Sequence, residues 1–112
     1  MLFRSPGHFF GMLTVVNKLL NITSPVATFF GEKDFQQLAL VKKMVSDLNM
    51  PIEVIGVETV RDHDGLALSS RNKRLTKDDR KLASQIPATL TLLKHSISEG
   101  HDLSKEIGRA HV

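Results

Sequence analysis

The chain contains no cysteine, no tryptophan and no tyrosine among its 112 residues. Without cysteine, neither a disulfide framework nor a cysteine-based metal site can form, which fits a cytoplasmic protein. Without tryptophan and tyrosine, the chain lacks two of the aromatic side chains on which nucleic-acid bases stack. We therefore expect no nucleic-acid partner.

Long apolar runs are also missing. Pairs such as Met12-Leu13 and Val15-Val16 are interrupted by Thr14 and Asn17, and runs of this length are too short to cross a bilayer. The first residues lack the apolar core of a signal peptide. We expect no membrane partner and a cytoplasmic location.

The formal charge is +3, and the basic residues are spread along the chain. Their one local cluster, over residues 71–81, is interleaved with acids. A nucleic-acid binder usually gathers its Lys and Arg on one face. A small anionic ligand such as a nucleotide accounts for this balance equally well.

Apolar periodicity predicts the order of the elements. Short apolar runs with β-branched or aromatic members indicate buried strands, and spacings of three and four residues indicate helices. We expect helices over residues 11–20, 34–48, 76–84 and 88–98, with Pro87 at the last junction, and strands over 26–30 and 52–57.

The alternation of helix and strand predicts an α/β fold with a right-handed parallel βαβ unit. Only two strands are expected, whereas parallel sheets are normally covered on both faces. The chain therefore has the pattern of the middle of a larger doubly wound domain.

Both ends of the chain look foreign to it. Residues 2–5 and 106–112 match translations of common short-read sequencing adapter, in opposite orientations. We expect native sequence over about residues 6–105 and give no functional weight to Arg4, Arg109 or His111.

The segment after the first expected strand has features of an anion site. Ligands of open α/β sheets lie at the carboxyl ends of strands. There Gly31 would let a ligand approach the backbone, and Lys33 is placed to meet a phosphate. Asp34 precedes a helix, whose free N–H groups favour anions. Asp34 and Gln37 also have the spacing of a capping box, so a purely structural role stays open.

Two further segments carry polar groups. Residues 64–72 read DGLALSSRN, and their hydroxyls and Arg71 suit phosphate oxygens, although such clusters are usually turns. His8 precedes a helix, where capping is the commoner role. The other histidines considered (His63, His95 and His101) have no metal-ligand spacing among them.

Together these segments resemble the pantothenate synthetase (pantoate–β-alanine ligase) family. Residues 6–11 are similar to the family's R-P-G-H-F-x-G helix, residues 30–37 to F-G-E-K-D-x-Q-Q, and residues 64–72 to D-G-L-A-x-S-S-R-N. The order and intervals also agree. The resemblance implies a Rossmann-like sheet of the nucleotidyl transferase superfamily over residues 6–72, and a hinge and the start of a small C-terminal domain over 73–105.

The same resemblance implies the chemistry. Members of this family join pantoate to β-alanine with ATP through a pantoyl adenylate, assisted by Mg²⁺, and are commonly homodimers. Residues 68–71 would form a mobile phosphate-binding segment similar to the KMSKS loop. The implied catalytic residues are Lys33, Ser69, Ser70 and Arg71. The implied ATP-binding residues are Gly31, Glu32, Lys33, Asp34, Val60, Leu68, Ser69, Ser70 and Arg71. The implied pantoate-binding residues are Gln37 and His8, and no residue is assigned to metal.

The chain departs from the family pattern in two ways. Ser5 stands where the family has Arg, which the adapter hypothesis explains. The family's first ATP motif, M-G-x-L-H-x-G-H, an upstream Gln that helps to bind pantoate, and most of the C-terminal domain are not in the chain. We therefore expect an inactive fragment. Two other interpretations stay open: another nucleotidyl transferase of the superfamily, and a non-catalytic nucleotide-binding or dimerisation module.

Overall fold

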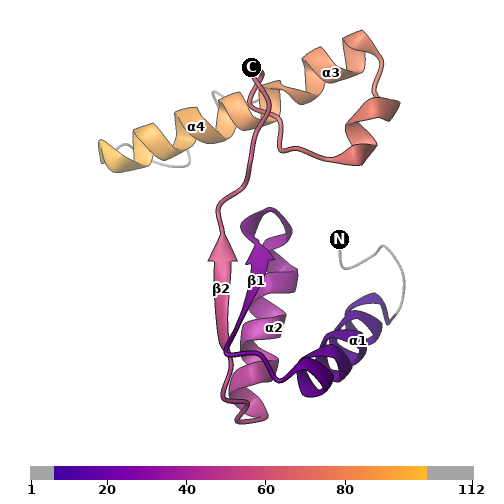
Figure 1. The fold of residues 1–112 in the computed structure, drawn as a ribbon. Coiled ribbons are helices and arrows are strands. Elements are labelled where there is room, and N and C mark those ends of the chain that lie inside the picture. Colours follow the sequence, from indigo (N-terminus) through magenta and orange to yellow (C-terminus); the bar gives the residue numbers. More distant parts are fainter. Residues whose placement is uncertain (1–6, 101–112) are drawn as a thin grey trace. The chain divides into compact units, whose positions relative to one another are not determined.

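The computed structural model describes residues 7–100 of the chain, and the two ends predicted to be non-native lie outside this range. The described part divides into two compact units, one within Met1–Thr59 and the other within Val60–Val112 (Figure 1). Each unit is described by itself. The predicted domain boundary after residue 72 stays a prediction.

The first unit is a βαβ unit preceded by a helix, as the apolar periodicity predicts. Its strands are parallel, and α2 lies along one face of them (Figure 1). The predicted α/β class is confirmed. The elements are α1 (His8–Thr23), β1 (Ala27–Gly31), the 3₁₀ turn η1 (Glu32–Asp34), α2 (Phe35–Asp47) and β2 (Glu53–Val57).

The core of this unit lies along one stripe of α2. Leu38, Val41 and Val45 are buried there, at the spacing of three and four residues that keeps them on one face. Leu20 of α1 forms one cluster with Val41 and Val45, and Phe30 and Val54 of the two strands pack against that cluster. Full burial of a Leu or Val side chain stabilises the fold by about 1.5–3 kcal/mol, so this stripe holds helix and strands together.

Both helices end where the sequence predicts a break. Ser24 adopts a left-handed conformation with φ 43° after α1, and Asn49 does the same with φ 53° after α2. A proline follows each of these residues within two positions. The proline cannot continue the helix, so the chain turns from each helix into the following strand.

The face of the sheet that points away from α2 is open. Phe29 is 66% exposed and Val57 is 45% exposed, although their neighbours Phe30 and Val54 pack in the core. Side chains alternate between the faces of a strand, so the open face is apolar. A parallel sheet is normally covered on both faces, which agrees with a chain that is part of a larger domain.

The second unit begins with a hairpin turn over residues 60–68. The Leu68 N–H donates to the Val60 carbonyl at 2.9 Å, an antiparallel bridge pairs Arg61 with Ala67, and Gly65 turns the chain with φ 84°. The predicted turn over 61–65 is confirmed. The 3₁₀ helix η2 (Ser70–Arg74), α3 (Lys77–Ala83) and α4 (Gln85–Ser98) follow.

The start of α3 is as predicted, but the junction with α4 is not. The Thr76 hydroxyl caps α3 by accepting from the Asp79 N–H at 3.1 Å. The break lies at Ser84 rather than at Pro87, because α4 begins at Gln85. Pro87 is therefore inside the first turn of α4, where its missing N–H removes no intrahelical hydrogen bond.

Candidate functional site

Gly31 ends β1 at the carboxyl edge of the sheet, where its partner in the register is Val57 of β2. Its φ of −69° and ψ of 136° are ordinary extended values, and an added Cβ would meet nothing within 4 Å. Neither backbone conformation nor packing within the described residues therefore requires glycine here. A close approach by a ligand remains a reason for it.

Lys33 and Asp34 follow at once on η1. The Lys33 ammonium lies 3.8 Å from the Asp34 carboxylate, and both side chains are substantially exposed. An exposed pair of this kind contributes little to stability. The Lys33 ammonium is therefore free to bind a phosphate, and the Asp34 carboxylate is free to bind a cation or to accept a hydrogen bond from a hydroxyl group.

The capping box that the spacing of Asp34 and Gln37 allows is not present. Asp34 occupies the N-cap position of α2, but its side chain makes no capping hydrogen bond. Asp34 is also the last residue of η1, and its φ of −96° and ψ of 65° differ from the extended backbone of a usual cap. Helix capping thus does not account for these two polar side chains.

Glu32 and His8 take other positions in the first unit. A Cβ added to Gly56 would lie 3.3 Å from Glu32 Oε1, so the Glu32 side chain rests against β2. His8 is the first residue of α1 and exposed. Its ring makes an edge contact with Phe9, with 5.3 Å between centroids.

Val60 and the segment Leu68–Arg71 belong to the second unit. Val60 is 64% exposed and Leu68 is 51% exposed. Their backbones are joined in the hairpin turn described above, so two of the predicted ATP contacts lie side by side.

The two serines of this segment differ. The Ser69 hydroxyl accepts from the Arg71 N–H at 3.2 Å and caps η2. Ser70 and Arg71 are exposed, and within residues 7–100 no hydrogen bond of their side chains is present. Arg71 shares the short helix with Lys73 and Arg74, which makes this turn cationic.

Comparison with known proteins identifies the family. The family model for pantoate-beta-alanine ligase matches residues 3–111. The chain belongs to the pantoate–β-alanine ligase family. The resemblance based on the three motifs is thereby confirmed.

Several pantothenate synthetases are similar to the chain. That of Vibrio parahaemolyticus is 56% identical over 97 residues, which are 87% of this chain and 32% of that protein. The pantothenate synthetase structure of Thermus thermophilus matches with a TM-score of 0.87 and 43% identity, over 95% of this chain and 38% of that one. The chain thus spans about a third of the length of such relatives.

One similar structure contains ligands. The pantoate–β-alanine ligase of Francisella tularensis, solved in complex with beta-gamma ATP and β-alanine, is 50% identical and has a TM-score of 0.67. The match covers 77% of this chain and 33% of that protein.

The metal expected for the family finds no complete site in the described residues. Within residues 7–100, no group of three or more His, Asp or Glu side chains could hold an ion. Mg²⁺ usually binds through one or two carboxylates together with substrate phosphates.

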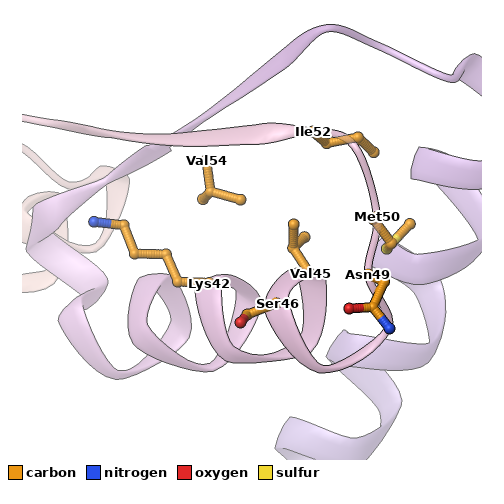
Figure 2. A pocket seen from close by; sticks show the side chains of 7 residues that line it. All are labelled: Lys42, Val45, Ser46, Asn49, Met50, Ile52 and Val54. Atoms are coloured by element: carbon orange, nitrogen blue, oxygen red, sulfur yellow. The ribbon is translucent and has the colours of Figure 1, made fainter.

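A shallow hollow of the first unit lies elsewhere. It measures about 320 Å³ and opens between the second half of α2 and the start of β2, where Val45 and Val54 point toward each other (Figure 2). This is the amino end of the strand, whereas ligands of open α/β sheets bind at the carboxyl ends. Lys42 is its one charged lining residue.

No helix of the described part is long and apolar enough to span a membrane.

One polar cluster was not singled out from the sequence. Arg80 of α3 forms ion pairs with Asp62 and Asp64 of the hairpin turn, at 2.8 and 2.7 Å. Only Asp64 belongs to a family motif, and its partner follows 16 residues later. A carboxylate pair two residues apart in a turn was the only available signal.

Proposed function

We propose that the chain is a segment of an ATP-dependent ligase that joins pantoate to β-alanine. The proposal rests on the polar residues and the glycine at the carboxyl end of β1. There Gly31 is required by neither conformation nor packing, and the polar side chains beside it make no capping bond. Membership of the pantoate–β-alanine ligase family agrees with this.

The proposed reaction has two steps. A pantoate carboxylate oxygen attacks the α-phosphorus of ATP, and the bond from that phosphorus to the bridging oxygen breaks, which releases pyrophosphate and leaves pantoyl adenylate. The amine of β-alanine then attacks the acyl carbon, loses a proton, and AMP departs. No group of the protein needs to form a covalent bond, so catalysis consists of positioning and charge stabilisation.

The residues of the first unit would hold both substrates. Lys33 would contact the phosphates, where negative charge develops as pyrophosphate leaves. Gly31, Glu32 and Asp34 would line the nucleotide, with the free N–H groups of α2 behind them. The Gln37 amide would donate to pantoate, and His8 would lie near the pantoate pocket.

The residues of the second unit would bind the leaving group. Arg71 presents a planar fork of donors that matches phosphate oxygens, and Ser70 adds a hydroxyl. Ser69 would contribute while it caps η2. Leu68 and Val60 would contact the nucleotide at the hairpin. Mg²⁺ would lower the charge of the phosphates.

The test uses a hybrid in which residues 7–100 replace the matching segment of the Thermus thermophilus enzyme. Pantothenate and AMP should form together and only with all three substrates. Lys33→Gln and Arg71→Gln should each lower kcat about a hundredfold, as loss of one charge-stabilising donor does. Lys43→Gln, which removes a charge that is 72% exposed on α2, should leave kcat unchanged.

Two outcomes would favour the other interpretations. A hybrid that forms AMP with a different acid would indicate another nucleotidyl transferase. A folded hybrid that self-associates but neither binds nor turns over ATP would indicate a dimerisation module. The 112-residue chain alone should be inactive, and steady-state AMP formation by it would refute that prediction. The homodimer of the full-length protein stays a prediction.

A further inference from the structure

Arg80 holds two carboxylates of the hairpin turn with one guanidinium group. Its Nε donates to Asp64 Oδ2 at 2.7 Å, and its Nη2 donates to Asp62 Oδ2 at 2.8 Å and to Asp64 Oδ1 at 3.3 Å. Asp64 is only 19% exposed, and Arg80 is 31% exposed. The planar fork therefore fixes the direction of the turn relative to α3, which a single ammonium cannot do.

The same carboxylates also organise the backbone of the turn. Asp64 Oδ1 accepts from the Leu66 N–H at 3.2 Å, and Asp62 Oδ1 accepts from the His63 N–H at 2.7 Å. The Asp62 N–H donates to the Leu66 carbonyl at 2.8 Å. Arg80 thus binds the same two carboxylates that accept hydrogen bonds from the backbone of the hairpin.

The turn also packs against α4. A Cβ added to Gly65 would lie 3.4 Å from the ring of Pro87, and Pro87 is a buried residue of α4. The hairpin is therefore held by an ion pair on one helix and by packing on the next.

The hairpin is followed directly by the residues proposed to bind phosphate. The Leu68 N–H donates to the Val60 carbonyl at 2.9 Å, and the Asn72 side-chain Nδ2 donates to the Ala67 carbonyl at 3.0 Å. Ser69, Ser70 and Arg71 lie between these two bonds. Their backbone position is consequently set from both sides by the hairpin.

We propose that Arg80 is a positioning residue, which fixes the Val60–Leu68 hairpin so that Ser69, Ser70 and Arg71 are presented to the phosphates of ATP. This inference rests on the proposed function of that segment. Arg80 acts through the carboxylates and touches no substrate. The Asp64 pKa is lowered from its usual range, and the largest cause is the hydrogen bond from Arg80. Asp64 and Arg80 are therefore both ionised at neutral pH.

The kinetic test compares three variants of the hybrid. Arg80→Lys keeps the charge but loses the fork, and should lower kcat about tenfold or more, because small misplacements of positioning groups are costly. The KM for pantoate should stay within about twofold, since Gln37 belongs to the other unit. Arg80→Gln should resemble Arg80→Lys, and the exposed neighbour Lys81→Gln should match the parent.

Two kinetic results would overturn the proposal. Parent kcat in Arg80→Lys would show that charge alone suffices. A parallel change of kcat and of the KM values for pantoate, β-alanine and ATP, together with loss of folded protein, would show a merely structural role.

A second measurement does not depend on catalysis. In the 112-residue chain, exchange of two backbone N–H groups should rise about tenfold or more in Arg80→Gln as the hairpin opens: that of Leu68, and that of Asn72, which donates to the Ser69 carbonyl at 3.1 Å. Exchange at Val41 should not change. Unchanged exchange at Leu68 and Asn72 would refute the positioning role. If the parent hybrid fails to turn over while exchange responds as expected, the proposed function fails and the hairpin contact stands.

Discussion

Replacing Gly31 with alanine separates ligand approach from structure. The perturbation is one methyl group at the carboxyl end of β1. Because φ is −69° and ψ is 136°, alanine fits the backbone, and its Cβ meets nothing within 4 Å. Removing glycine also restricts the unfolded chain. The free energy of unfolding should therefore stay unchanged or rise by about 0.4–1 kcal/mol.

Nucleotide binding should respond in the opposite direction. If the phosphates or ribose of ATP pass against the backbone of Gly31, the methyl group occupies their space. We expect ATP affinity of the hybrid to fall at least about tenfold, or about 1.4 kcal/mol. Isothermal titration with a non-hydrolysable ATP analogue measures this, and thermal unfolding followed by circular dichroism measures stability.

Gly56→Ala provides the contrast. Its Cβ would lie 3.0 Å from Leu38 Cδ2 and 3.3 Å from Glu32 Oε1, so it should destabilise the first unit by about 1–3 kcal/mol through overpacking. Parent-like ATP affinity in a folded Gly31→Ala hybrid would refute the ligand explanation for this glycine. Unfolding of Gly31→Ala would refute the geometric reasoning itself.

Three further predictions concern stability. Val41→Ala, at a fully buried site, should lower the unfolding free energy by about 1.5–3 kcal/mol, whereas Val15→Ala, at a site that is 57% exposed, should change it by less than about 0.5 kcal/mol in denaturant titrations. Thr76→Ala should cost the second unit about 1 kcal/mol by removing the cap of α3, seen as lost helical signal at lower temperature; an unchanged melting curve would exclude a capping role. The pKa of Asp62 is lowered from 3.8 to about 2. The largest cause is the hydrogen bond from the His63 N–H, followed by those from the His63 side chain and from Arg80. The contribution of Asp62 to the free energy of unfolding is therefore present above pH 3.8 and lost as the pH falls toward 2. The stability of Asp62→Asn should fall less steeply with acid than that of the parent. Equal plots of stability against pH for the two proteins would contradict this.

The order of elements in the first unit follows from the sequence because its signals are local. The spacing of Leu38, Val41 and Val45 predicts α2, and the apolar runs predict β1 and β2. The same information predicts the cap at Thr76, since a hydroxyl three residues before an N–H is within reach of it. These elements lie where the pattern places them.

The failures have physical causes of a different kind. Pro87 was expected to separate two helices, but a proline in the first turn breaks no bond, and its ring instead supports Gly65. The capping box at Asp34 was undone by a 3₁₀ turn that changes the N-cap backbone. The grip of Arg80 on Asp62 spans 18 residues, and no local pattern indicates which charged residues meet at that distance.

The pairing of Phe30 with Gly56 has a consequence for strand alignment. Phe29 and Phe30 are adjacent, so hydrophobicity alone does not determine which of them faces α2. A slip of one residue would exchange the faces of the strand that moves and shift it by about 3.3 Å along its partner. A Cβ at Gly56 would already lie 3.0 Å from Leu38 Cδ2, so a slip of β2 that put Ile55 or Val57 in that position would require Leu38 to move. Gly56 therefore favours the observed register, in which Gly31 pairs with Val57 and Lys33 follows two residues after Gly31.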